Sequence, residues 1–111
     1  MTMEKKTIKF RDFLAELVLK GEKTSTWRLF DDKDFQIGDE VDLINWNTGE
    51  KFAEGVLTDV REKKLGHLQP PDFEGHEKFE SEQAMYDAYR TYYGDRVGPE
   101  TVVKIIRFEL K

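Results

Sequence analysis

The sequence predicts a single α+β domain, in which about five to six strands curve into a small barrel flanked by two α-helices. Two segments carry apolar side chains at helical spacing, and strand-like segments and a hairpin signal lie between and after them. The chain of 111 residues is long enough for one modest hydrophobic core, so we expect one domain over residues 1–111.

The N-terminal part predicts a short strand over residues 7–10 and an amphipathic helix over residues 11–20. The helix is indicated by apolar side chains at helical spacing, namely Phe10, Phe13, Leu14, Leu17 and Val18. Gly21 follows and suits the left-handed position that ends a helix. We expect Phe13, Leu14 and Leu17 to pack across the barrel core.

Residues 24–28 form the next β-prone segment. In an extended chain Ser25 and Trp27 share one face, and the other face carries Thr24, Thr26 and Arg28. Trp27 is the natural inward anchor. Taken alone, the segment is typical of an edge strand whose polar face meets water.

A hairpin is predicted in the middle of the chain. Residues 41–46 form its first strand, residues 47–49 its turn, and residues 51–61 its return strand, with Gly55 as a β-bulge that would help the sheet curl. We expect five side chains of the sheet to point into one barrel core: Trp27, Leu43, Val56, Ile106 and Phe108.

Residues 66–76 are predicted to be irregular, because Pro70 and Pro71 cannot sit inside a helix or a central strand. We interpret His67 and His76 as surface loop residues.

The C-terminal part predicts a second helix and a final strand. Ser81 is a candidate cap for the helix, and Gly94 would end it. The apolar face of this helix would carry Ala84, Met85, Ala88, Tyr89 and Tyr92. Residues 102–110 hold most of the remaining aliphatic side chains, as a central strand would.

The composition excludes several classes of function. No apolar run approaches the ~20 residues of a membrane helix, and no secretory signal is present, so we expect a cytoplasmic protein without a membrane partner. The absence of cysteine excludes thiol nucleophiles and a disulfide-linked partner. A net charge of −5 argues against coating nucleic acid by bulk electrostatics, although a small basic site could still capture one nucleotide.

Motifs for metals and cofactors are missing. No glycine-rich phosphate loop occurs. Residues 32–38 match a calcium loop only in part, because Leu43 stands where the closing glutamate belongs. We therefore expect no metal and no cofactor. The one local basic cluster, Arg61, Lys63 and Lys64, is small.

The segment Gly21-x-Lys23-x-x-Thr26-x-Arg28, directly after an amphipathic helix, resembles the signature of the ASCH domain, a small β-barrel related to the PUA fold. The turn Ile37-Gly38-Asp39-Glu40-Val41 is similar to the one that follows in that family, and the strand Val102–Phe108 matches as well. The similarity covers about residues 8–110, so the resemblance implies a PUA-like curved barrel.

Within that family, this short single-domain chain resembles the bacterial N4-acetylcytidine amidohydrolases. The resemblance implies Lys23 as proton acceptor, Thr26 as nucleophile and Glu77 as proton donor. Glu77 follows from counting back from the Tyr92-Tyr93-Gly94 end of the second helix, and Glu74 and Glu80 are close enough to be alternatives. Arg28 and Thr24 are the candidate substrate-binding residues.

The chemistry explains why such residues are needed. Amide cleavage requires a nucleophile, a base that deprotonates it and an acid for the leaving amine. A lysine, which ordinarily titrates near ~10.4, becomes a useful base when desolvation and a nearby cation favour its neutral form. Arg28 could be that cation, or it could bind the base carbonyl or the developing oxyanion. The apolar neighbours Phe73 and Phe79 would raise the pKa of Glu77.

Other interpretations stay open from the sequence alone. Lys23 could be a solvated lysine at a helix end and Glu77 a surface carboxylate. The protein could be an RNA-binding PUA-like module without catalysis, or an ASCH-type ribonuclease. We expect a modified nucleoside or single-stranded RNA as the partner, and a monomer or weak dimer.

Overall fold

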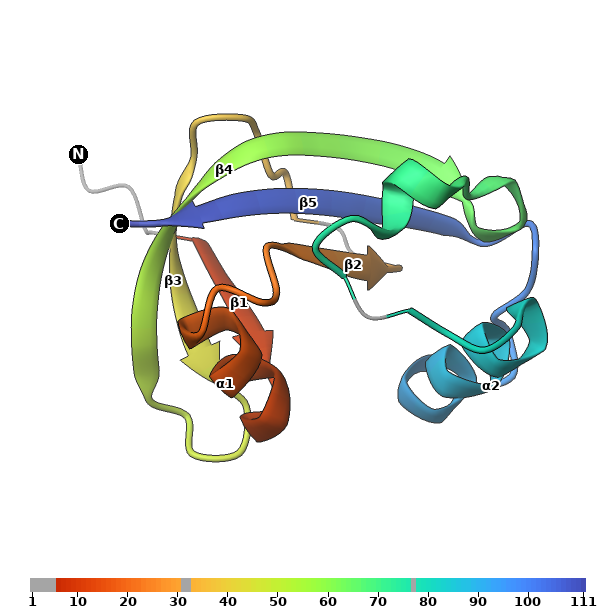
Figure 1. Ribbon diagram of the computed structural model, residues 1–111, viewed down its shortest axis with the longest axis horizontal. Helices are drawn as coiled ribbons and strands as arrows, with labels where there is room; N and C mark the ends of the chain where they lie inside the picture. Colours follow the sequence, from red (N-terminus) through yellow and green to blue (C-terminus); the bar gives the residue numbers. More distant parts are fainter. Residues whose placement is uncertain (1–5, 31–32, 77) are drawn as a thin grey trace.

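The computed structural model describes residues 6–30, 33–76 and 78–111. Figure 1 shows the order of its elements along the chain. They are β1 (Lys6–Phe10), α1 (Asp12–Leu19), β2 (Ser25–Leu29), β3 (Glu40–Asn45), β4 (Lys51–Lys64), the 3-10 turns η1 (Leu65–His67) and η2 (Pro70–Phe73), α2 (Glu82–Tyr93) and β5 (Val102–Leu110). The predicted order of strands, helices and hairpin is confirmed.

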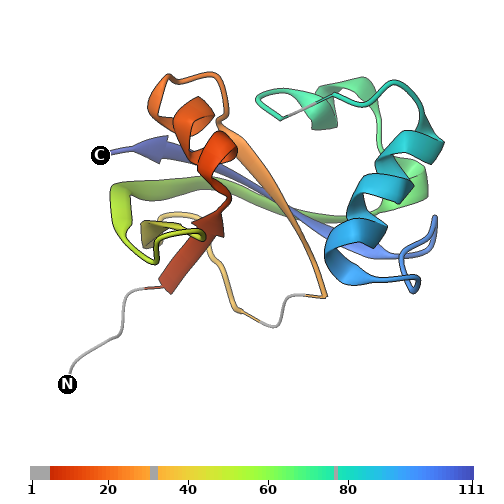
Figure 2. The same ribbon diagram turned by 90° about the horizontal axis from the view of Figure 1, so that it is seen from below.

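The strands form one curled sheet in the order β1-β3-β4-β5-β2. β1 pairs with β3 in parallel, and the other neighbours are antiparallel. β1 and β2 are the two edges, and no ladder joins them among the described residues. Figures 1 and 2 show α1 and α2 at opposite ends of the molecule, with β2 between them. This is the predicted α+β fold, a five-stranded half-barrel with two helices.

The curl of the sheet arises at two register shifts. One lies between Leu43 and Ile44 in β3, and the other between Leu57 and Asp59 in β4. The expectation of a bulge at Gly55 is wrong, because its pairing is regular on both sides. A side chain there would meet the Glu109 carbonyl oxygen 3.2 Å from its Cβ, so glycine permits close packing of β4 against β5.

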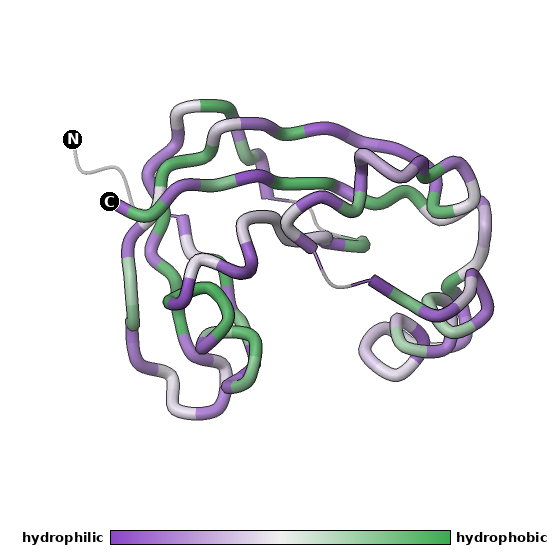
Figure 3. The backbone as a smooth tube through the Cα atoms, in the orientation of Figure 1, coloured by the Kyte–Doolittle hydropathy of each residue, from purple (hydrophilic) through white to green (hydrophobic). Residues whose placement is uncertain are grey.

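The hydrophobic core is divided into two clusters. The first contains Ile8, Phe10, Ala15, Val18, Phe35, Val41, Leu43, Leu57, Ile106 and Phe108. The second contains Trp27, Leu29, Leu65, Met85, Tyr86, Tyr89, Val97, Val103 and Ile105. β5 contributes to both, because successive residues such as Ile105 and Ile106 point to opposite faces of a strand. β5 runs between β4 and β2 with green apolar stretches in Figure 3.

This division corrects the expectation of a single core. Trp27 is buried as expected, but it pairs with Ile105 across the ladder and therefore joins the second cluster rather than that of Ile106. Val56 is only half-buried, and its neighbour Leu57 is the core residue of β4.

α1 covers the first cluster. Ala15 and Val18 are buried, and Leu14 packs against the cluster, whereas Phe13 is 56% exposed. The expectation that Phe13 packs into the core is therefore wrong. In Figure 3 α1 is largely green, because it also carries exposed apolar side chains such as Leu19. Gly21 follows with φ of 77°, as the helix end requires.

α2 begins and ends as predicted. The Ser81 hydroxyl accepts a hydrogen bond from the Ala84 amide at 3.1 Å, and Gly94 has φ of 91°. Its buried face is Met85, Tyr86 and Tyr89. Neither α1, with eight residues, nor α2, with twelve, is long and apolar enough to cross a membrane.

Candidate functional site

A pocket of about 390 Å³ lies at the free edge of β2, between residues of α1 and residues of α2. Its walls come from β1, the start of α1, β2, the β3–β4 hairpin, the segment before α2, and α2 itself. The lining residues are Lys9, Phe10, Arg11, Phe13, Leu14, Lys23, Thr26, Trp27, Arg28, Trp46, His76, Phe79, Ala88, Tyr89, Tyr92 and Tyr93.

Burial divides this lining into a floor and a mouth. We define the floor as the buried polar residues Lys23, Thr26 and His76 with the buried Trp27. The mouth carries exposed aromatic rings, which belong to Phe13, Trp46 and Tyr92. Polar groups that are shielded from water at the base of an apolar-walled pocket are typical of a ligand site.

The end of α1 delivers Lys23 to the floor. The amides of Glu22 and Lys23 both donate to the Leu17 carbonyl, at 2.9 and 3.2 Å, so the chain reverses tightly after Gly21. Lys23 is then only 4% exposed, although lysine is among the residues most often found in water. The interpretation of Lys23 as a solvated helix-end lysine is wrong.

β2 places Thr26 on the same floor as Lys23. Thr26 is opposite Ile106 in the ladder and is 5% exposed. β2 is an edge strand, as expected, but Ser25, Thr26, Trp27 and Leu29 are all buried. The polar face of this segment is therefore only partly in contact with water: Thr26 is buried, Arg28 is half-buried and Thr24 is exposed.

Arg28 links the two edges of the half-barrel. Its Nη2 donates to the Lys9 carbonyl at 2.6 Å, and its guanidinium lies 5.3 Å from the centre of the Phe10 ring. A cation thus stands on the same strand as Thr26 and lines the same pocket.

The segment before α2 lies against the start of β2. The amides of Thr24 and Ser25 donate to the Gly75 carbonyl at 2.9 and 3.1 Å, and the Ser25 hydroxyl donates to the Glu74 carbonyl at 3.3 Å. Gly75 has φ of 74°, and a Cβ there would lie 2.0 Å from the Thr24 hydroxyl oxygen. Only glycine fits this contact, which brings the next residue, His76, into the pocket wall.

His76 is a site residue that the sequence did not reveal. Its ring stacks on Trp27 with centroids 3.9 Å apart, and its Nε2 lies 3.3 Å from the Tyr89 hydroxyl. The surface-loop interpretation is wrong for His76, which is 9% exposed, whereas His67 is exposed as expected. The buried Trp27 Nε1 has no hydrogen-bond partner within the described ranges.

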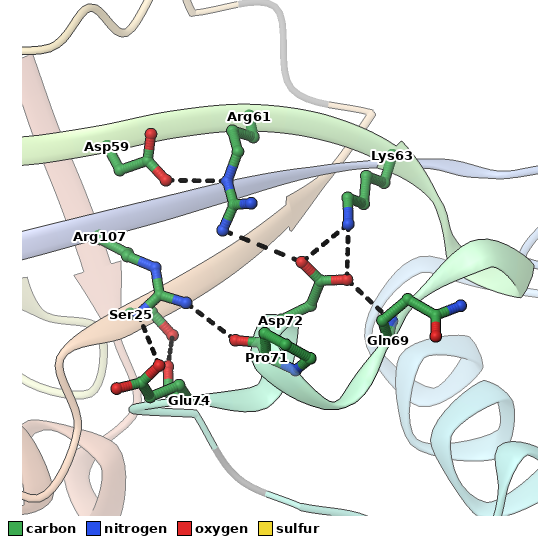
Figure 4. A network of polar contacts seen from close by, with 9 residues as sticks. All are labelled: Ser25, Asp59, Arg61, Lys63, Gln69, Pro71, Asp72, Glu74 and Arg107. Atoms are coloured by element: carbon green, nitrogen blue, oxygen red, sulfur yellow. Dashed lines mark hydrogen bonds and ion pairs between the residues drawn. The ribbon is translucent and has the colours of Figure 1, made fainter.

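A buried carboxylate holds this segment to the sheet (Figure 4). Asp72 accepts hydrogen bonds from Lys63 Nζ at 3.0 and 2.9 Å and from the Gln69 amide at 2.8 Å, and Arg61 lies 3.9 Å away. Burial by itself would raise the pKa of Asp72, but the Lys63 and Gln69 hydrogen bonds and the two cationic charges together lower it.

The side chains of the basic cluster, Arg61, Lys63 and Lys64, all form ion pairs. Arg61 also pairs with Asp59 at 2.8 Å, and Lys64 pairs with Glu100 at 2.7 Å. All three cations of this cluster therefore face a carboxylate.

The structure brings three of the predicted site residues together, since Lys23, Thr26 and Arg28 all line the pocket. Thr24 is not among the lining residues; it packs against Gly75 instead. Glu77 lies outside the described residues, although His76 and Phe79 on either side of it line the pocket. The catalytic and binding roles of these residues stay predictions.

No three histidine, aspartate or glutamate side chains gather as a metal site in the part of the chain that the structure describes.

Comparison with known proteins relates the fold to solved structures. No protein-family model matches the sequence, and no curated protein matches it. An ASCH domain from Lactobacillus crispatus has a TM-score of 0.70 at 18% identity, over 89% of this chain and 70% of that one. The DUF984 protein EF3133 from Enterococcus faecalis has a TM-score of 0.75 at 14% identity, over 99% and 82% of the two chains. An ASCH protein from Zymomonas mobilis has a TM-score of 0.67 at 12% identity, over 93% and 65%. At these identities the likeness is one of fold.

Proposed function

The chain has the ASCH-domain fold, and on this premise we propose that it is an amidohydrolase that removes an acyl group from a modified nucleoside such as N4-acetylcytidine. The observation that carries the proposal is the burial of Lys23 and Thr26 together on the floor of one pocket. A lysine and a hydroxyl shielded from water are the pair that an activated nucleophile needs.

In the proposed reaction, the neutral amine of Lys23 takes the proton of the Thr26 hydroxyl. The hydroxyl oxygen then attacks the acetyl carbonyl, and the C–N bond breaks as the exocyclic amine receives a proton. Water hydrolyses the resulting acetyl ester of Thr26, which gives acetate and restores the hydroxyl. The net reaction is amide plus water to amine plus carboxylic acid.

The surroundings support both partners of this step. Lys23, which is 4% exposed, lies on the same floor as the Thr26 hydroxyl whose proton it would accept. Arg28, on the same strand, is a candidate donor to the developing oxyanion. The proton donor to the leaving amine is assigned to Glu77 by the resemblance alone.

The pocket also suits a nucleobase. Its volume of about 390 Å³ lies within the range of small-molecule sites. Aromatic rings make up much of its lining, among them Trp27, Tyr89 and Tyr92, and such rings pack well against a planar base.

The test is incubation of the purified protein with N4-acetylcytidine, with cytidine measured by chromatography. Thr26→Val keeps the side-chain shape and removes the nucleophile, so turnover should fall by at least ~10²-fold. Thr58→Val, at an exposed position of β4, is the matched control and should keep the parent rate. Undiminished turnover in folded Thr26→Val protein would refute the nucleophile assignment.

A second candidate is an RNA-binding module without catalysis. The observation that favours it is the exposed aromatic mouth, since Phe13, Trp46 and Tyr92 could stack bases of a single strand. RNA binding without turnover of any acylated nucleoside would select this candidate over the hydrolase.

A further inference from the structure

We propose that the pocket takes a nucleotide, with the base on the floor and the phosphate held at the mouth by Arg11 and Lys9. The inference deepens the proposed function and rests on it for the identity of the base. The phosphate site itself rests on the charge and geometry of the mouth.

Cationic side chains outnumber carboxylates among the described residues of the lining. The net charge is −5, yet the described lining residues include four cations, Lys9, Arg11, Lys23 and Arg28, and no aspartate or glutamate. A cleft lined by one sign of charge concentrates ligands of the other sign, whatever the net charge of the protein.

Arg11 is held in a defined position at this mouth. Its guanidinium lies 4.3 Å from the centre of the Trp46 ring on the hairpin and 5.1 Å from that of Tyr92 on α2. A guanidinium that stacks its face on aromatic rings keeps its N–H donors in its own plane, where they can bind two oxygens of one phosphate.

The neighbouring acidic group does not neutralise Arg11. No carboxylate in the described ranges forms an ion pair with Arg11, and the Asp12 carboxylate accepts a hydrogen bond from Asn45 at 2.6 Å instead. Lys9, an exposed residue of β1 that also lines the pocket, supplies a second cation, and its backbone carbonyl accepts a hydrogen bond from Arg28. Arg11 and Lys9 thus belong to adjacent parts of one wall.

The two ends of the pocket match the two ends of a nucleotide. The base is attached to C1′ of the ribose and the 5′-phosphate to C5′, so the sugar separates them and the phosphate can reach the mouth when the base lies among the buried floor residues. The exposed side of the pocket carries Lys9 and the half-buried Arg11. The shared ligand chemistry is a phosphate-bearing cytidine, either free or at a position within a short RNA.

The first test compares kcat/KM for N4-acetylcytidine and its 5′-monophosphate. We expect the phosphate to raise kcat/KM by about tenfold or more, the scale of one or two charge-assisted hydrogen bonds at a partly exposed site. Arg11→Gln and Lys9→Gln should each lower the ratio of the two values severalfold. Lys20→Gln, which removes an equal charge at the exposed end of α1, is the matched control and should leave the ratio unchanged.

A binding test separates this inference from the proposed function. Calorimetric titration with cytidine and cytidine 5′-monophosphate needs no turnover, and the monophosphate should bind about tenfold more tightly, less so at high salt. If neither acetylated compound is hydrolysed but this preference depends on Arg11 and Lys9, the phosphate site stands and the hydrolase proposal falls. If the nucleoside is hydrolysed and the phosphate gives no advantage in either assay, the phosphate site is refuted.

A hexanucleotide with one internal N4-acetylcytidine distinguishes the sources of the phosphate: turnover above that of the monophosphate points to RNA, and turnover below it points to the free nucleotide. Should Arg11→Gln fail to fold, as judged by circular dichroism, Lys9→Gln still decides the question, because Lys9 is exposed and its side chain forms no core contact.

Discussion

Replacement of Asp72 by asparagine tests how the segment that carries His76 is held. Asparagine has the shape of aspartate, but its amide group offers one acceptor oxygen and one donor nitrogen. Both oxygens of Asp72 accept hydrogen bonds: one from Lys63, the other from Lys63 and the Gln69 amide. In either orientation the amide nitrogen of the introduced side chain would face a donor, so at least one of these bonds must be lost.

The loss of stability expected for Asp72→Asn can be judged from how deeply Asp72 is buried. Asp72 is 1% exposed, and breaking a fully buried ion pair costs about 3–5 kcal/mol. The Lys63 side chain is 33% exposed and can turn toward water, which lowers the cost. We therefore expect the free energy of unfolding to fall by about 2–3 kcal/mol, the scale of one or two hydrogen bonds to a charged group.

The stability that Asp72 contributes should decrease in acid. Burial alone would raise the pKa of folded Asp72, but the Lys63 and Gln69 hydrogen bonds together with the charges of Lys63 and Arg61 hold it below its ordinary value of 3.8. A group with a depressed folded pKa contributes stability that is present above the unfolded pKa and is lost as the pH falls through the folded pKa. The stability difference between parent and Asp72→Asn should be full at pH 7 and shrink below about pH 3.8.

The assay is urea unfolding of both proteins at pH 7 and at several values down to about pH 2, below the unfolded pKa. Asp95→Asn, at an exposed turn, is the matched control and should change stability by less than about 0.5 kcal/mol. Equal stabilities of Asp72→Asn and Asp95→Asn at pH 7 would refute the reasoning, as would a difference that does not diminish in acid.

Three further outcomes are expected. Gly75→Ala should lower the free energy of unfolding by about 1–3 kcal/mol in urea unfolding, because the new Cβ would collide with Thr24 and the residue has a positive φ. The control Gly98→Ala has open space around its Cβ and should not lower it. Equal effects of the two substitutions would contradict the contact between Gly75 and Thr24. Lys23→Arg should lower turnover of N4-acetylcytidine by ~10²-fold or more in steady-state kinetics with little change in substrate binding, because arginine cannot act as a base. A turnover rate equal to that of the parent protein would exclude Lys23 as the proton acceptor. Ser81→Ala should cost about 1 kcal/mol in thermal unfolding through loss of the α2 cap, and an unchanged melting temperature would show that the cap is not needed.

The elements whose signals are local could be predicted from the sequence. The end of α1 at Gly21, the hairpin turn and both ends of α2 depend on residues within a few positions of one another. The spacing of Lys23, Thr26 and Arg28 is local too, and it predicted three residues that the fold brings to one pocket.

The features that depend on distant segments could not be predicted in this way. The core residues of β5 alternate between two clusters, and nothing in the sequence of β5 indicates that Trp27 joins Ile105 rather than Ile106. His76 carries no pattern of its own that predicts burial.

The sequence by itself therefore determined the element order, the fold class and the motif residues, because helix ends, turns and strand alternation are properties of neighbouring residues. Only the tertiary structure decided which faces are covered. His76 is buried because Gly75 fits against Thr24, a residue far earlier in the chain, and because Asp72 fastens the segment to β4. Contacts between residues so far apart in the sequence depend on the packing of the whole chain. The buried polar groups that they satisfy find no partner within their own segment.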